Sequence, residues 1–215
     1  MNQKTNNLID SIDNIVRKNL RKIAVFINWL SSGKITPNSI TISGAIFHLI
    51  VAWLIINNQL IPAAIFLIFF GLFDTLDGEL ARLQKTQSSA GALLDATTDR
   101  FKEIILYSAI AYYFVHHNQA IFAVWAVIAC GFSISVSYVR AKSEAVYAES
   151  GRSTSNLGKT FKNGLLRFEV RILLLVIGLM ANQLAWVIVI IAILSFYTAI
   201  NRLIDSSLRL KHDKN

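Results

Sequence analysis

The sequence has little charge and lacks the residue types on which several common kinds of site depend. Only 16% of its 215 residues are Asp, Glu, Lys or Arg, and its single cysteine is Cys130. One cysteine excludes a disulfide within the chain and a metal site built from several thiolates. We also find no glycine-rich phosphate loop, no internal repeat and no nucleic-acid-binding module. The sequence therefore gives no support for a nucleic-acid partner.

Apolar residues dominate the composition instead. Hydrophobic residues make up 54% of the chain and the mean hydropathy is +0.50, which is typical of a polytopic membrane protein. The length leaves room for about six spans of roughly 20 residues each and for very little soluble structure. We therefore expect an all-α membrane protein with six transmembrane helices between residues 38 and 205, forming a single domain over residues 1–215. The apolar stretches are residues 40–56, 60–80, 92–113, 120–139, 165–180 and 184–200.

The positions of the basic residues predict the topology. No Lys or Arg occurs in residues 35–81, 103–139 or 172–201. The connections at residues 57–59, 116–119 and 182–183 carry no Asp, Glu, Lys or Arg. The positive-inside rule then places these connections outside and both termini in the cytoplasm, which requires an even number of spans. The net charge of +8 then reflects basic residues that lie on the cytoplasmic side of the cell membrane.

A segment before the first span has amphipathic character. Over residues 8–32 apolar residues recur at helical spacing, and Arg17, Lys18, Arg21 and Lys22 occupy the other side. This pattern predicts a helix that lies on an anionic membrane surface. A helix packed on the cytoplasmic ends of the bundle is compatible with the same pattern.

Four aspartates lie close together beside or within two apolar stretches. On a helix, Asp74 and Asp77 share one face with Gly78, Ala81 and Arg82. Three residues on the following segment share a second face at intervals of four, and they are Gly91, Asp95 and Asp99. The residues between, 83–90, suit a polar turn that joins two antiparallel helices. Four carboxylates would then converge on one small volume.

Such a cluster is unfavourable unless cations neutralise it, because intramembrane acids are costly and like charges repel. Carboxylates without a neighbouring Cys or His ligand favour Mg²⁺, Mn²⁺ or Ca²⁺ over zinc. Two such ions bridging a pyrophosphate are a recurrent arrangement for attack at phosphorus. Gly78 and Gly91 would leave room for the ligand, and Arg82 would neutralise phosphate charge. Alternatively, the aspartates are solvated helix-end charges paired with nearby basic residues, namely Arg82, Lys85, Arg100 and Lys102.

The spacing D-x2-D-G-x2-A-R-x8-G-x3-D-x3-D resembles the signature of the CDP-alcohol phosphotransferase family at every fixed position. The resemblance implies a six-helix, homodimeric membrane enzyme that displaces CMP from a CDP-lipid using two divalent cations, Mg²⁺ or Mn²⁺. It implies that Asp74, Asp77, Asp95 and Asp99 hold the metal. It further implies that Asp99 is the catalytic base and that three residues contact the CDP portion, namely Gly78, Arg82 and Gly91.

Basic residues later in the chain suggest the acceptor. SYVRAKSE, which contains Arg140 and Lys142, resembles the corresponding segment of the family branch that uses inositol phosphate. Arg167 and Arg171 stand four residues apart, whereas that branch spaces its arginine pair by three. We expect these four residues to bind the acceptor phosphate, with inositol phosphate first and glycerol 3-phosphate as the alternative. Because apolar sequence follows Arg171 directly, its side chain should point inward to an anion or a carboxylate.

A function of another class fits intramembrane acids in principle, namely a cation-coupled transporter. A transport path should have polar or broken-helix features near the midplane and on the far side of the membrane. The far halves of the expected spans are uncharged and the chain has only two prolines. The sequence therefore favours the enzyme.

Overall fold

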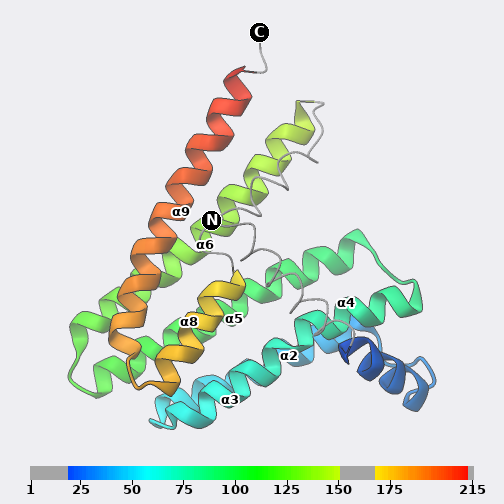
Figure 1. Ribbon diagram of the computed structural model, residues 1–215, viewed down its shortest axis with the longest axis horizontal. Coiled ribbons are helices and arrows are strands. Elements are labelled where there is room, and N and C mark those ends of the chain that lie inside the picture. The colour runs from blue at the N-terminus through cyan, green and yellow to red at the C-terminus, as the bar shows by residue number, and fades with distance from the viewer. Residues whose placement is uncertain (1–18, 151–167, 213–215) are drawn as a thin grey trace. The chain divides into compact units, whose positions relative to one another are not determined.

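The computed structural model describes residues 19–150 and 168–212, and within these ranges all regular structure is helical (Figure 1). Residues 19–30 form a first helix, which lies within the segment 8–32 where an amphipathic helix is expected, and residues 8–18 lie outside the described residues. The helices that follow are α2 (Pro37–Ile56), α3 (Leu60–Gly71), α4 (Phe73–Gln84), α5 (Ser89–His116), α6 (Ala120–Glu149), α8 (Phe168–Met180) and α9 (Leu184–His212).

Four helical runs in the described part of the chain are long and apolar enough to cross a membrane. They are Pro37–Ile56, Leu60–Gln84, Ala120–Glu149 and Leu184–Lys211, and the second combines α3 with α4. The expected all-α membrane class is therefore confirmed. The helix α8 covers 13 residues in the described region and α5 carries several charges near its start, so neither is among these four. The count of six spans stays a prediction.

The three uncharged connections are tight turns of one kind. Each contains an asparagine in the left-handed conformation, with φ of 58° at Asn58, 57° at Asn118 and 53° at Asn182. Asparagine tolerates this conformation better than other non-glycine residues. The residue after each asparagine donates its N–H to the carbonyl five positions earlier, at 2.8 Å in all three turns. These bonds satisfy carbonyls at the helix ends, so each turn closes a helical hairpin.

The chain divides into two compact units, and the first comprises residues 1–51 and 65–102. Its apolar core includes Ala24, Ile40, Leu76 and Leu80. On α2, Phe47 stacks on Phe70 with ring centroids 4.8 Å apart and meets Phe73 edge-on at 5.6 Å. This packing fixes α4, which carries the first two aspartates, against α2.

The second unit comprises residues 52–64 and 103–215. In it α6 and α9 pack along each other, and α8 also packs against α9. The Ser143 hydroxyl donates to Ser206 at 3.0 Å, and Arg202 donates to the carbonyl of Val136 at 3.2 Å. Because later residues of α6 pair with later residues of α9, the two helices run parallel.

Candidate active site

The two helices that carry the aspartates form a hairpin with a four-residue turn. Lys85 ends α4 in the left-handed conformation, with φ 56°, and the Thr86 N–H donates to the Ala81 carbonyl at 3.0 Å. At the start of α5 the Ser88 hydroxyl accepts a hydrogen bond from the Gly91 N–H at 3.0 Å, which is an N-cap interaction. The turn expected at residues 83–90 is thus shorter, because helix continues to Gln84 and resumes at Ser89.

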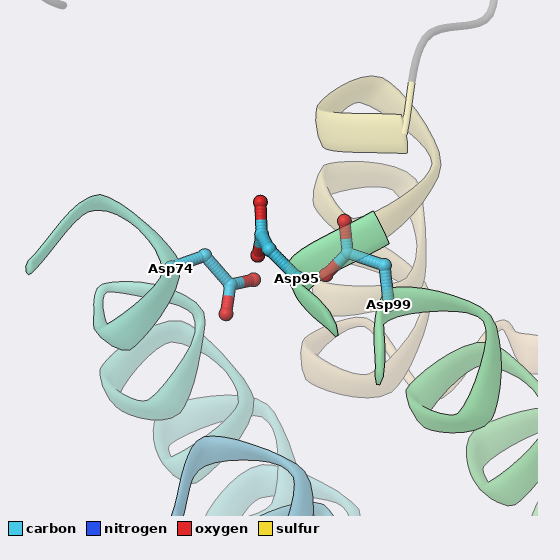
Figure 2. Close-up of side chains that lie close together, drawn as sticks. All are labelled: Asp74, Asp95 and Asp99. Atoms are coloured by element: carbon cyan, nitrogen blue, oxygen red, sulfur yellow. The ribbon is translucent and has the colours of Figure 1, made fainter. Parts of the chain in front are cut away.

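Three of the four aspartates converge in this hairpin. Asp74 on α4 and Asp95 and Asp99 on α5 each offer a carboxylate oxygen, and the three oxygens lie within 4.8 Å of one another. Figure 2 shows the side chains from the two helices turned toward a common point. All three residues are partly exposed, so an ion could reach them.

The fourth aspartate, Asp77, does not belong to this group of three. It is 6% exposed and accepts a hydrogen bond of 2.5 Å from the Thr41 hydroxyl on α2. It lines a cavity of about 190 Å³ that Asp95 also lines. Asp77 therefore reaches the same site from its cavity side.

All three small residues of the sequence pattern line this cavity, namely Gly78, Ala81 and Gly91. Because Gly78 and Gly91 have no side chains, the backbones of α4 and α5 are open to the cavity. At Gly91 an added Cβ would come within 3.2 Å of the Ser88 hydroxyl, so a larger residue there would require the Ser88 side chain to shift. The cavity lining comprises Pro37, Asn38, Thr41, Asp77, Gly78, Ala81, Thr86, Gln87, Ser88, Gly91, Ala92 and Asp95.

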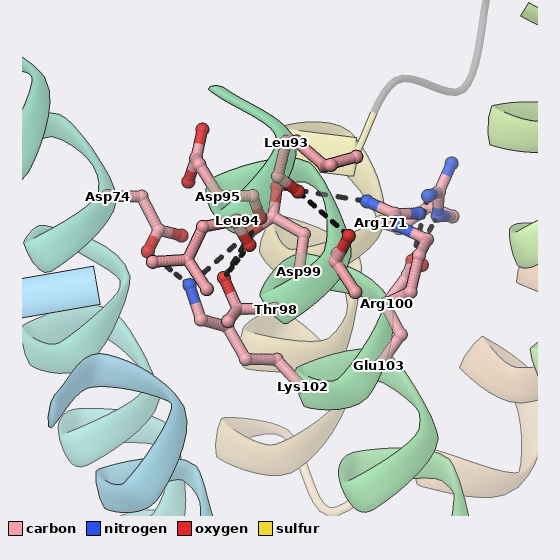
Figure 3. A network of polar contacts seen from close by, with 11 residues as sticks. Asp74, Leu93, Leu94, Asp95, Thr98, Asp99, Arg100, Lys102, Glu103 and Arg171 are labelled. Carbon is pink, nitrogen blue, oxygen red and sulfur yellow. Dashed lines mark hydrogen bonds and ion pairs between the residues drawn. The ribbon is translucent and has the colours of Figure 1, made fainter. Parts of the chain in front are cut away.

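The aspartate centre also contains Lys102, which is expected from the sequence only as one of four basic residues that could pair with the aspartates. The Lys102 side chain is fully buried, and its Nζ contacts Asp74 and donates to Asp99 Oδ1 at 3.2 Å (Figure 3). The only signal in the sequence is its position three residues after Asp99 on one helix, which places both side chains on one face. That spacing also suits a solvated ion pair, so it could not reveal the burial.

The donor set fits a hard divalent cation. Among the described residues the centre offers carboxylate oxygens from two helices and no thiol or imidazole, as Mg²⁺ and Mn²⁺ prefer. Asp95 Oδ1 is buried and has no hydrogen-bond partner in the described part of the chain. A buried carboxylate oxygen without a donor is costly, and a cation would satisfy it.

Arg82 lies where a phosphate-neutralising residue was expected, but it has a protein partner. Its Nη2 is 2.6 Å from Glu79 Oε1, one turn earlier on α4. The same nitrogen is 3.6 Å from the position of a Cβ added at Gly78, so the guanidinium lies over that glycine. The Arg82 side chain is 44% exposed, which leaves it accessible to a ligand.

The residues expected to bind the acceptor phosphate belong to the second unit. Arg140 and Lys142 are exposed on α6, and Arg140 pairs with Glu144 at 3.0 Å. Arg171 on α8 is buried, and its guanidinium contacts Glu103 at 2.7 and 2.8 Å. The inward orientation expected of Arg171 is therefore confirmed, with a carboxylate as its partner. Arg167 lies outside the described residues.

A model of the family described as CDP-alcohol phosphatidyltransferase matches residues 34–200 of this chain. The chain therefore belongs to the CDP-alcohol phosphatidyltransferase family, which agrees with the resemblance seen in the sequence. All four aspartates, the cavity and Lys102 lie within the matched segment. The chain is thus an integral membrane protein of an enzyme family.

Two named proteins are similar to this chain over most of its length. The phosphatidylinositol phosphate synthase of Corynebacterium glutamicum is 34% identical over 149 residues, which cover 68% of this chain and 63% of that protein. The chain thus spans less than two thirds of that relative. The archaetidylinositol phosphate synthase of Pyrococcus horikoshii is 31% identical over 182 residues, covering 85% of this chain and 89% of that one.

Solved structures of phosphatidylinositol phosphate synthase from Mycobacterium tuberculosis share the fold. The structure with CDP-DAG bound is 25% identical, with a TM-score of 0.74, and the match covers 87% of this chain and 92% of that one. The complex with manganese and citrate is 24% identical, with a TM-score of 0.75, and covers 87% and 88%.

Proposed function

We propose that this protein transfers the phosphatidyl, or phospho-lipid, group of a CDP-linked lipid alcohol to the hydroxyl of a polar acceptor and releases CMP, as a step of phospholipid biosynthesis. The observation that carries the proposal is the convergence of Asp74, Asp95 and Asp99 beside a cavity that Asp77 lines. The M. tuberculosis enzyme that binds CDP-DAG supports a CDP-lipid as donor, either CDP-diacylglycerol or its archaeal equivalent.

The aspartates would hold divalent cations, two by the family pattern and either Mg²⁺ or Mn²⁺. The metal ligands are Asp74, Asp77, Asp95 and Asp99. Bound there, the cations would neutralise the pyrophosphate and stabilise the departing CMP. The manganese in the related M. tuberculosis structure supports this assignment.

The protein's own residues would position the donor and move one proton. The cavity beside Gly78 and Gly91 admits the CDP portion, with Arg82 beside its phosphates. Asp99 accepts the proton of the acceptor hydroxyl, whose oxygen bonds to the phosphorus next to the lipid alcohol. The bond from that phosphorus to the oxygen of CMP breaks, so CMP leaves with the bonding electrons.

The acceptor we propose is inositol phosphate, with glycerol 3-phosphate as the alternative. Both relatives described above are named as synthases of inositol phosphate lipids. A phosphorylated polyol also suits the basic residues Arg140, Lys142, Arg167 and Arg171, because guanidinium groups pair well with a phosphate dianion.

We further propose that the chain forms a single catalytic domain with six spans and works as a homodimer. The uncharged turns support outward-facing connections, with the active site and both termini in the cytoplasm. The described helix at residues 19–30 would lie on the membrane surface.

Release of CMP tests the proposal. Purified protein in detergent, given CDP-diacylglycerol, inositol phosphate and Mg²⁺, should produce CMP and a phosphorylated lipid product. EDTA should abolish turnover and excess Mg²⁺ or Mn²⁺ should restore it, because the carboxylates need a cation to bind pyrophosphate.

Two results would count against this function. Full turnover in EDTA would remove the aspartates from a metal-binding role. Absence of CMP release with every acceptor, together with cation flux in proteoliposomes, would favour the cation-coupled transporter.

A further inference from the structure

Lys102 is fully buried within the aspartate centre. Lysine is rarely enclosed in this way unless its ammonium is paired. Here the ammonium bridges two helices, since it contacts Asp74 on α4 and Asp99 on α5 (Figure 3). The same two carboxylates belong to the group of three that could hold a metal ion.

A cation that bridges two carboxylates competes with any other cation for the same oxygens. At separations of a few Å the repulsion between an ammonium and a divalent ion is strong, even at an effective dielectric constant of about 20. Lys102 is 0% exposed, so its side chain cannot move into solvent without opening the packing around it. The ammonium therefore holds the position between Asp74 and Asp99.

Two further carboxylates, those of Asp77 and Asp95, lie on the cavity side of the centre. Asp95 Oδ1 is buried and has no hydrogen-bond donor in the described part of the chain. Asp77 lines the same cavity as Asp95, and its described hydrogen bond is to the neutral Thr41 hydroxyl. These two carboxylates are not bridged by Lys102, so they can accept a divalent ion.

We propose that, before CDP-lipid binds, the Lys102 ammonium takes the place of one of the two divalent cations expected at the aspartates. In the absence of CDP-lipid the protein then binds one divalent ion tightly, on the side of Asp77 and Asp95. This inference rests on the proposed function, because it takes the aspartates as metal ligands. It makes Lys102 a positioning residue, which orders the carboxylates of α4 and α5 and sets the number of metal ions bound.

The experiment counts bound Mn²⁺ without measuring catalysis. The full chain in detergent is titrated with Mn²⁺ in the absence of CDP-lipid, and free Mn²⁺ is followed by electron paramagnetic resonance. The unaltered protein should bind one Mn²⁺ tightly per chain. Lys102→Met should bind two, with affinity for the second ion raised by about tenfold or more.

Matched variants separate this effect from a general loss of charge. Lys34→Met removes one exposed lysine from the same unit and should leave the count at one. Lys102→Arg keeps a cation and should also bind one ion. Thermal unfolding and size-exclusion chromatography show whether each variant is folded.

Two tight Mn²⁺ sites in the unaltered protein would overturn the inference, and this result does not depend on any variant. A folded Lys102→Met protein with the same count and affinity as the unaltered chain would also overturn it. If CMP is still released in either case, the proposed function stands. No tight Mn²⁺ site at all would remove both this inference and the metal-binding role of the aspartates.

Discussion

At the scale of single residues, Asp99 combines two roles that a substitution can separate. It belongs to the group of three carboxylates and contacts Lys102, and we propose it as the base. Asp99→Asn should therefore lower the rate of CMP release by about 100-fold or more, because the amide cannot accept the proton. CDP-lipid binding, measured by isothermal titration, should persist.

Asp77→Asn is the comparison for that prediction, since Asp77 lines the cavity and has no proposed role as base. This variant should weaken CDP-lipid binding as well as turnover. An equal loss of CDP-lipid affinity in both variants would mean that Asp99 acts only as a ligand.

The buried pair of Glu103 and Arg171 should matter for stability. Both side chains are 1% exposed, so removing one partner deprives a buried charge of this contact. Arg171→Met should destabilise the protein by about 3–5 kcal/mol, whereas the double variant Glu103→Leu/Arg171→Met should regain much of that loss. Thermal unfolding in detergent measures both.

Arg209→Met, at an exposed position in the same unit, should leave the unfolding temperature nearly unchanged. If Arg171→Met unfolds at the same temperature as the unaltered protein, the pair does not stabilise the protein. In that case the expected acceptor-binding role of Arg171 becomes the stronger explanation for its presence.

Spacing in the sequence predicted which aspartates could meet, because i, i+4 positions on a helix fix one face. Three of them do meet, while Asp77 faces the cavity and Thr41. Local spacing could not show the burial of Lys102 or the pairing of Arg171 with Glu103. Those contacts depend on how helices distant in the sequence pack together.

At the scale of helices, hydropathy predicted the turns better than the helix ends. The uncharged connections lie at the expected positions. In contrast, α6 continues to Glu149 and α9 to His212, well past the apolar stretches that end at 139 and 200. Apolar content predicts only the part of a helix that lies in the membrane. Past the ends of the apolar stretches, α6 and α9 remain in contact, as the hydrogen bond from Ser143 to Ser206 shows.

The close approach of α8 and α9 gives a prediction at this scale. A Cβ added at Gly178 would lie 2.9 Å from Val187 Cγ2, so a larger side chain must push the helices apart. Gly178→Leu should lower stability by about 1–3 kcal/mol, seen as a lower unfolding temperature in detergent.

Gly131 on α6 is the control, because an added Cβ there meets nothing within 4 Å. Gly131→Leu should unfold at nearly the original temperature. Equal unfolding temperatures for the two leucine variants would show that the α8 and α9 contact tolerates a large residue.

At the scale of the whole molecule, composition was enough to predict an all-α membrane protein. The spacing of the four aspartates was enough to predict the CDP-alcohol phosphatidyltransferase family. A chain that is 54% hydrophobic with long uncharged runs has few alternatives to a helical membrane protein. The acceptor pocket was harder to predict, because Arg140, Lys142 and Arg171 lie on two helices separated by a polar stretch. Spacing along one helix says nothing about whether such residues meet.

The acceptor can be tested on Arg140, which is exposed and pairs with Glu144 at 3.0 Å, so its loss should not disturb the core. With one CDP-lipid and a panel of acceptors, the phosphorylated polyols should turn over well above serine and free inositol. Arg140→Ala should raise the KM for inositol phosphate by about tenfold, because a charge-assisted hydrogen bond to phosphate is lost. The KM for CDP-lipid should change much less.

Glu144→Ala, which frees Arg140 without removing it, should not raise the acceptor KM. Serine or free inositol as the best acceptor would exclude a phosphate-binding role for the basic residues, while the metal site and the release of CMP would be unaffected.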